Sequence, residues 1–221
     1  MNMLPKSISL SAVLEKTGIA LVAVSVFVLF YTFYPVIQAE VGYQLLPRGN
    51  EKIVLTETEL RDRQRENPLR ANEVLVPVDE AFGIVIPKIE ANARVIQDVS
   101  WTIPSVYQEA LSRGVAHAEG TALPGEEGNV FLFSHSGVDF LEANRYNALF
   151  YLIDKLVAGD EIILMFEGKK YRYEVTKKEV VSPERLEYLK GEQDTKMLTL
   201  MTCTPAGTTL RRLVVLAKQL D

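Results

Sequence analysis

Short apolar runs separated by turn-forming residues dominate the chain from about residue 82 to its end. Runs of about four to eight residues bounded by Gly, Pro, Asn or Asp are typical of β-strands. Many such runs at close spacing, with only brief helical segments between them, favour a mostly β fold, either a barrel or a sandwich. The predicted strands are Phe82–Ile86, Ala93–Ile96, Asn129–Ser134, Glu161–Phe166, Tyr171–Val175, Lys178–Val181, Met197–Thr202 and Arg211–Val215.

Three stretches have the composition of helices instead. Residues Ser105–Arg113 predict one helix that Gly114 closes, because glycine is the preferred residue just after a helix. Residues Leu141–Leu156 carry apolar side chains at mixed helical spacings and predict one helix or two short ones. Residues Thr56–Glu66 have Thr56 as a cap candidate but no convincing apolar stripe, so we expect a solvated helix or a flexible stalk.

An uncharged apolar segment of twenty residues, Gly18–Ile37, precedes the β-rich region. A helix of about twenty residues crosses a hydrocarbon core about 30 Å thick. Tyr31 and Tyr34 lie near its C-terminal end, where aromatic rings favour a membrane interface, and Lys6 and Lys16 before it favour a cytoplasmic N-terminus. A cleaved signal peptide would need a shorter apolar region, and a buried core helix would carry a polar stripe. We therefore predict one N-terminal transmembrane helix that acts as an uncleaved signal anchor.

The sequence divides into four parts on this basis. We expect a cytoplasmic tail over residues 1–17, a transmembrane signal anchor over 18–37, a linker or stalk over 38–80 and a folded domain over 81–221. The last part is about 140 residues long, which is an ordinary size for one domain. It would lie outside the membrane, on the extracytoplasmic face.

Composition excludes one class of function. The formal net charge of -5 argues against a dedicated nucleic-acid binder, because such a protein normally presents a basic face. A hydrophobic content of 48% is sufficient for a packed core.

The single cysteine, Cys203, lies at the end of the predicted strand Met197–Thr202. The segment Thr204–Gly207 then breaks the strand, and Arg211–Val215 begins another. One cysteine cannot form an internal disulfide. A lone cysteine is more often an inert core residue than a catalyst, but a thiol at a strand end, facing a Pro/Gly loop with arginine beyond it, is placed like a nucleophile.

A cysteine nucleophile also needs a proton acceptor and a means to stabilise negative charge. Of the two histidines, His135 directly follows a predicted strand, whereas His117 lies in a segment that we expect to be a loop. Rigid placement therefore favours His135 as the catalytic acid or base. Arg211 and Arg212 are the cationic candidates, and only one of them can share a face with Cys203, because strand side chains alternate.

These residues and their surroundings resemble the sortase family, the cysteine transpeptidases of bacterial cell surfaces. The best match is Thr199–Gly207 followed by Arg212–Val215, which is similar to the family signature TLxTCxPxG…RLVV. The resemblance runs in order along the chain and also includes Ile86–Ile89, Gly114–His117, Gly120–Glu126, Gly128–Asn129, Ser134–His135, Gly159–Ile162 and Tyr171–Tyr173.

The resemblance implies a sortase-type eight-stranded β-barrel with short helices and a defined mechanism. Cys203 would attack a backbone carbonyl in a surface protein's sorting signal, commonly between Thr and Gly of an LPxTG-like peptide. His135 would protonate the leaving amine and later help to deprotonate the incoming one. Arg212 would hold the substrate or stabilise the oxyanion, and Thr202 is expected to contact the peptide. The amine acceptor would be a peptidoglycan cross-bridge or precursor, or a lysine of a pilin subunit.

Some positions depart from the family pattern or leave a choice. Ser134 stands where the family often has Gly before the catalytic histidine. Of the two adjacent arginines we choose Arg212, because its spacing of nine residues from Cys203 and the Leu-Val after it fit the signature. His117 matches a family position not usually assigned to catalysis, so we expect it to be structural. We expect no metal site and no cofactor.

Two other classes of protein remain as alternatives. An L,D-transpeptidase would carry a histidine and a glycine-rich turn just before its cysteine, which this sequence lacks. A non-enzymatic surface domain that binds a partner would tolerate Cys203→Ala. Within the sortases, the stretch before Ala81 has no plug like that of pilin-type members, and no apolar tail precedes Asp221, which favours anchoring or a specialised substrate over pilus polymerisation.

Overall fold

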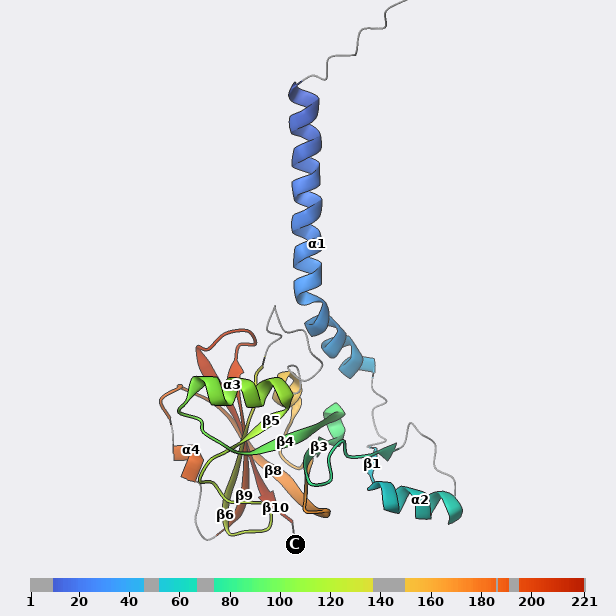
Figure 1. Cartoon of the computed structure of the whole chain (residues 1–221), viewed down its shortest axis with the longest axis vertical. Helices are drawn as coiled ribbons and strands as arrows, with labels where there is room; N and C mark the ends of the chain where they lie inside the picture. Colours follow the sequence, from blue (N-terminus) through green and yellow to red (C-terminus); the bar gives the residue numbers. More distant parts are fainter. Residues whose placement is uncertain are drawn as a thin grey trace, which may run out of the picture.

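The computed structural model describes residues 10–45, 52–66, 74–136, 150–185, 187–190 and 195–220. Eight strands of the described chain form a closed barrel in the order β10-β8-β7-β3-β4-β5-β6-β9 (Figure 1). This confirms the predicted eight-stranded β-barrel. The barrel strands are β3 (Phe82–Ile86), β4 (Ala91–Val99), β5 (Val115–Ala118), β6 (Gly128–Phe133), β7 (Glu161–Phe166), β8 (Lys169–Val181), β9 (Lys196–Thr204) and β10 (Arg211–Gln219).

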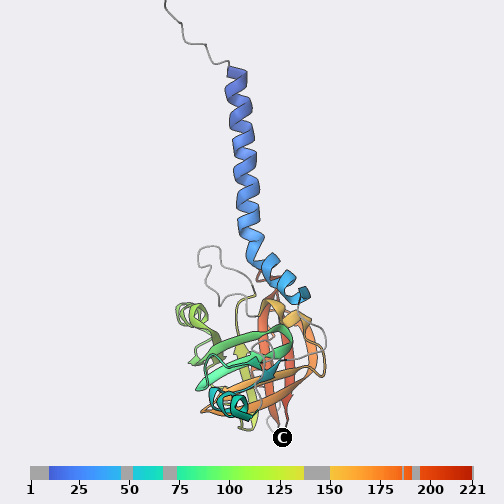
Figure 2. The ribbon, with the colours of Figure 1, turned by 90° about the vertical axis from the view of Figure 1, so that its right-hand side faces the viewer.

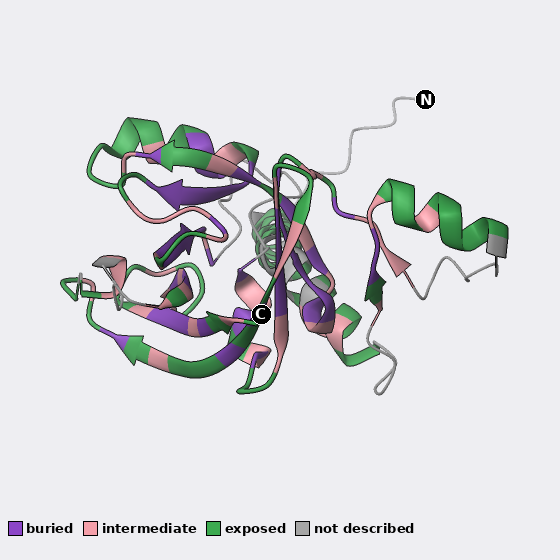
Figure 3. Ribbon diagram, turned by 90° about the horizontal axis from the view of Figure 1, so that it is seen from below, coloured by how far each residue is buried: buried purple, intermediate pink, exposed green. Residues whose placement is uncertain are grey.

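The interior of the barrel is the main hydrophobic core. Alternate residues of each strand point inward, because side chains on a strand alternate between its two faces. Leu132 of β6, Leu200 of β9 and Val215 of β10 all belong to this core and are fully buried. Figure 3 shows buried residues along the barrel strands.

A second apolar cluster lies on the outer face of β5 and β6, under the helix α3 (Pro104–Arg113). Phe131 and Phe133 of β6 pack there against Ala110 and Leu111 of α3. Both faces of β6 are therefore buried, which explains its nearly continuous apolar sequence. As predicted, α3 ends at Gly114, whose backbone N–H donates to the carbonyl of Ala110 (3.2 Å).

The N-terminal helix α1 (Leu10–Leu45) rises from one end of the barrel (Figures 1 and 2). Its segment Val13–Tyr31 is long and apolar enough to cross a membrane. The helix continues beyond the predicted apolar span, and its last turns contact the barrel. Glu40 pairs with Lys155 of the 3₁₀ helix η3 (Tyr151–Lys155) at 3.0 Å, and Tyr43 packs against the main core cluster.

Two short strands flank the helix α2 (Glu57–Glu66) and hold its segment against the barrel. β1 (Ile53–Val54) pairs in parallel with β2 (Val74–Leu75). Val54 then packs on the outer face of β3 and β7, together with Val85 and Ile163. The helix itself is solvated, as predicted, and mostly exposed in Figure 3. β1 and β2 pack against the barrel on either side of α2 in the sequence, so this part of the predicted linker is not a free stalk.

Four other elements refine the predicted boundaries. The 3₁₀ helix η2 (Pro87–Ile89) follows β3, and α4 (Glu187–Lys190) precedes β9. β8 is one continuous strand where two runs were predicted. Within the predicted helix Leu141–Leu156, residues 141–149 lie outside the described residues, and η3 occupies most of the rest.

One expectation about the histidines was wrong. His117 lies in β5, between β4 and β6, rather than in a loop. The sequence Val115–Ala118 is too short and too rich in alanine to stand out as a strand, and its neighbours on the sheet supply the stability.

Thr56 caps α2 through a reciprocal pair of hydrogen bonds. The backbone N–H of Glu59 donates to Thr56 Oγ1 (3.2 Å), and the backbone N–H of Thr56 donates to Glu59 Oε2 (2.8 Å). We expect Thr56→Ala to cost about 1 kcal/mol of local helix stability. Amide hydrogen exchange within α2 should then be about five-fold faster. Thr58→Ala, an exposed change in the same turn, is the control, and equal exchange in both variants would contradict the cap.

Candidate active site

Cys203 and Arg212 are brought together by the antiparallel pairing of β9 and β10. Their Cα atoms are direct partners in the ladder. Partners of this kind have Cβ atoms about 4.5–5.5 Å apart and side chains on the same face. Because Leu213 points into the barrel core, Arg212 points to the outer face. Cys203 is half-buried on that outer face.

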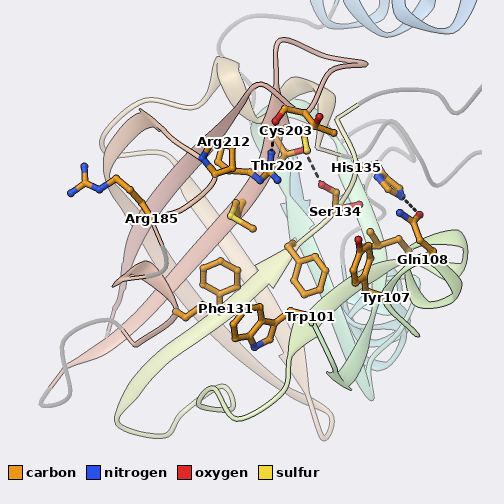
Figure 4. A pocket seen from close by; sticks show the side chains of 16 residues that line it. Trp101, Tyr107, Gln108, Phe131, Ser134, His135, Arg185, Thr202, Cys203 and Arg212 are labelled. Atoms are coloured by element: carbon orange, nitrogen blue, oxygen red, sulfur yellow. Dashed lines mark hydrogen bonds between the residues drawn. The ribbon is translucent and has the colours of Figure 1, made fainter. Parts of the chain in front are cut away.

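His135 reaches the groove from the other side of β9, just after β6. β6 runs parallel to β9, with Phe133 opposite Met201, and the backbone N–H of Ser134 donates to the carbonyl of Met201 (3.2 Å). His135 follows β6 by two residues and lines the same groove as Cys203. The three predicted catalytic residues come from β9, from β10 and from the residues just after β6, and all three line one groove (Figure 4).

The groove has a volume of about 310 Å³ and an apolar floor. Phe131, Phe133 and Met201 form the floor, on the outer face of β6 and β9. One wall comes from α3 and the residues before it, including Trp101 and Tyr107. The opposite wall comes from the connection between β8 and β9, including Pro183, Arg185 and Leu189. An apolar groove with a few polar groups at one end suits an extended peptide.

Gln108 also lines the groove and touches His135 directly. Its Oε1 lies 3.1 Å from His135 Nε2 (Figure 4). Sequence reasoning missed this residue, since Gln108 is an exposed helical position 27 residues before its partner. Only the packing of α3 against the barrel brings the two together.

Arg212 and its neighbour Arg211 differ in environment. Arg212 lines the groove, and its Nη1 donates to the carbonyl of Thr209 (3.1 Å). Arg211 is exposed and is not among the lining residues. Of the two arginines, Arg212 is therefore the one that lines the groove, and its catalytic role stays a prediction.

Comparison with known proteins fits this arrangement. The family model of the sortase domain matches residues 84–220. This chain belongs to the sortase family. The match contains the barrel strands from Ile84 onward together with Cys203, His135 and Arg212.

Individual sortases are similar at moderate identity. Sortase A of Streptococcus agalactiae serotype III (strain NEM316) is 27% identical over 132 residues, which are 60% of this chain and 50% of that protein. Sortase D of Bacillus subtilis (strain 168) is 24% identical over 144 residues, 63% of this chain and 64% of that protein. The chain thus spans between half and two thirds of the curated relatives that it matches.

Solved sortase structures share the fold. The type III crystal structure of Streptococcus agalactiae sortase C1 is 31% identical with a TM-score of 0.54, over 66% of this chain and 70% of that one. A Clostridium perfringens sortase D5 transpeptidase is 25% identical with a TM-score of 0.53, over 74% of this chain and 95% of that one. The matches include sortases named A, C and D.

Thr202 makes a structural contact at the centre of this sortase site. Its hydroxyl donates to the carbonyl of Ser134 (2.9 Å), and its side chain is buried. This bond ties β9 to the residue just before His135. Thr202 also lines the groove, so its predicted contact with a peptide stays a prediction.

His117 lies away from the groove and is fully buried. Its Nδ1 accepts from the backbone N–H of Asp98 (3.3 Å), and its Nε2 lies 3.0 Å from the carbonyl of Ala122. The ring is therefore neutral, with its proton on Nε2. Burial lowers the pKa of His117, although the Ala122 carbonyl and the Asp98 carboxylate oppose this effect. These contacts agree with the expected structural role.

Within the described residues, no group of three or more His, Cys, Asp or Glu side chains gathers in a way that could hold a metal ion. The chemistry that we consider below uses only protein groups.

Burial of neutral His117 makes stability depend on pH. The folded state has the lowered pKa, so the unfolded state takes up the proton first, below its ordinary pKa of about 6.5. Stability from this group is present above that pH and is lost as the pH falls. We expect His117→Gln to cost about 1–3 kcal/mol at pH 7, and to reduce the loss of stability between pH 7 and 5.

Urea denaturation at several pH values measures this effect. His135→Gln is the matched control, because it removes the other histidine and should leave the acid dependence largely unchanged. An unaltered acid dependence in His117→Gln would contradict the assignment.

Proposed function

We propose that this protein is a membrane-anchored sortase that cleaves a sorting signal through a thioester and transfers the acyl group to an amine. The observation that carries the proposal is that Cys203, Arg212 and His135 line one apolar groove, with Cys203 and Arg212 paired across β9 and β10. Thioester acyl transfer needs a thiol, a proton carrier and a cation near the reacting carbonyl, and these residues supply them.

The first half of the reaction forms the acyl-enzyme. The thiol of Cys203 gives its proton to His135, and the thiolate Sγ attacks the scissile carbonyl carbon, whose oxygen becomes negatively charged. The guanidinium of Arg212 stands across the ladder from Cys203 and stabilises that oxygen. As the C–N bond breaks, His135 gives a proton to the departing amine. The acyl group remains on Cys203 as a thioester.

The second half releases the product. An incoming primary amine attacks the thioester carbon while His135 takes up the proton that the nitrogen loses. The C–S bond breaks, and Cys203 returns to the thiolate state. The product is a new amide bond, so the reaction needs no external energy source.

The substrate would be a surface protein with an LPxTG-like signal, as the family resemblance implies. The apolar floor at Phe131, Phe133 and Met201 suits the apolar side chains of such a peptide. The acceptor would be a peptidoglycan precursor or cross-bridge, or a pilin lysine. One structural relative is titled a pilus-related sortase C of group B Streptococcus, so both kinds of acceptor belong in the test.

Anchoring would come from α1. Its apolar segment Val13–Tyr31 would cross the membrane once, with the barrel on the extracytoplasmic face. The ion pair between Glu40 and Lys155 joins α1 to the barrel. It lies at the end of the barrel that carries the loop between β9 and β10 (Figure 1). The opening of the groove would then face the same compartment as membrane-held surface proteins.

The thioester is tested directly by mass spectrometry of the full chain in detergent. We incubate it with a panel of LPxTG-type peptides and hydroxylamine and look for a hydroxamate product and for an acyl adduct on Cys203. The wild type should give product, and Cys203→Ala should give neither product nor adduct. Product from Cys203→Ala would overturn the proposed nucleophile.

The role of Arg212 is tested against its neighbour. Arg212→Lys keeps the charge but loses the planar fork that can donate two hydrogen bonds to the oxyanion. We expect kcat/KM to fall about a hundred-fold, the cost of losing one donor to an oxyanion. Arg211→Lys, on the exposed side of the same strand, should change kcat/KM less than about two-fold. Similar losses in both variants would refute a specific role for Arg212.

A further inference from the structure

One face of the last turns of α1 is docked on the barrel. Glu40 Oε1 accepts a hydrogen bond from Lys155 Nζ (3.0 Å), and the same Nζ lies 5.8 Å from the centre of the Tyr43 ring. Tyr43 also packs against the main core cluster. A single lysine of η3 therefore contacts both side chains, and this part of the helix is joined to the barrel by an ion pair and by apolar packing.

Another face of the same turns carries exposed apolar side chains. Ile37, Val41 and Leu45 are between 46% and 76% exposed. Their spacing of four residues places them on one side of the helix, away from the two side chains that contact the barrel. Tyr34 is three residues before Ile37, is also exposed and continues the row. We call these four residues the apolar stripe. Exposed apolar side chains that gather on one face, rather than scatter singly, mark an interaction surface.

The stripe follows directly on the segment Val13–Tyr31, which is long and apolar enough to cross a membrane. A straight helix would carry Leu45 about 21 Å beyond this segment, past a head-group layer of about 5–8 Å. Figures 1 and 2 show instead that the last turns of α1 bend away from the axis of its long part. Pro35 stands between the two parts, and a proline inside a helix removes a backbone hydrogen bond and bends the helix. The bend keeps the stripe closer to the bilayer.

We propose that residues 34–45 lie in the interface of the bilayer, with the apolar stripe in lipid and with Glu40 and Tyr43 on the barrel. An interfacial helix buries its apolar face about 5–10 Å into the boundary between head groups and acyl chains. Tyr34 suits this boundary, because tyrosine has an apolar ring and a polar tip. The segment then holds one end of the barrel against the membrane. This inference rests on the membrane anchor of the proposed function.

The barrel presents further apolar side chains at the same end. Leu210, in the connection between β9 and β10, is 70% exposed. Val157, two residues after the lysine that binds Glu40, is also exposed. Figures 1 and 2 show the connection between β9 and β10 at the end of the barrel from which α1 rises. Since this connection leads from Cys203 to Arg212, the contact with lipid would hold that end of the groove beside the membrane.

Spin labels on single cysteines measure the depth of each position. Cys203→Ala removes the one natural cysteine, so a new cysteine can be placed and labelled in the full chain, in vesicles of phosphatidylcholine. Oxygen concentrates in lipid and a nickel chelate stays in water, so the access of each reagent to the label gives its depth. We expect labels at Ile37→Cys, Val41→Cys and Leu45→Cys to lie about 5–10 Å into the boundary.

Gly42→Cys is the matched control, because it lies on the same turns but off the stripe. A Cβ at this position meets no other atom within 4 Å, so the change fits the structure. Its label should be more open to the nickel chelate than the labels on the stripe. Stripe labels that are as open to nickel as this control would overturn the proposal. Stripe labels closed to both reagents would also overturn it, because protein would then cover them, and magnetic broadening between labels would identify a second copy of the chain.

A label at Val24→Cys, in the middle of the apolar segment, tests the anchor separately. If the nickel chelate reaches this label, the proposed anchor fails and the inference fails with it. If this label lies in lipid while the stripe lies in water, the inference alone is refuted. A wild type that turns over no peptide would refute the proposed acyl transfer and leave the measured depths unaffected.

Removing the docked face tests whether α1 holds the barrel. Glu40→Lys with Tyr43→Ala places like charges beside Lys155 and removes the packed ring. We expect a label at Leu210→Cys to lie at the interface in the otherwise unchanged chain and to move into water in this double variant. Glu57→Lys, which breaks an exposed ion pair on α2, is the control and should leave the label where it was. A label at Leu210→Cys with the same depth in all three proteins would show that the docked face does not hold the barrel at the membrane.

Discussion

The candidate site depends on one constraint, that β9 is hydrogen-bonded on both of its edges. β6 pairs with it in parallel and β10 in antiparallel orientation. The antiparallel register pairs Cys203 with Arg212, and the parallel one brings the end of β6, just before His135, next to β9, although His135 lies 68 residues from Cys203 in the sequence. A slip of one residue in either register would turn its residue to the opposite face of the sheet. The barrel must therefore close in this register before any of the chemistry is possible.

The same strands also explain why the groove lies where it does. Their inner residues, such as Leu132 and Leu200, fill the barrel, so no substrate can enter there. Their outer residues, such as Phe133 and Met201, are covered on one side by α3 and on the other by the segment before β9. A strip of apolar surface stays open between α3 and the segment before β9. The candidate catalytic residues line the same groove, where the proposed reaction would meet a peptide held along this strip.

Most strands could be predicted from the sequence, and the candidate reactive residues could be named from it, because both leave local signals. An apolar run bounded by Pro or Gly marks a strand, and the Thr-Leu-x-Thr-Cys motif marks Cys203. The strand around His117 left no such signal, since its stability comes from β4 and β6 on either side. Gln108 could not be found either, because a polar residue on an exposed helical face looks the same whether or not a histidine packs against it. Only the tertiary structure shows whether such a residue contacts a histidine.

The hydrogen bond of Thr202 to Ser134 gives this residue a structural role that does not depend on any substrate. β6 ends at Phe133, two residues before His135. The hydroxyl of Thr202 binds the carbonyl of Ser134 across this gap and extends the parallel pairing toward the level of Cys203. Because the bond is buried, water competes little for either group. The side chain that the family pattern predicts to contact the peptide thus holds the backbone that leads to His135.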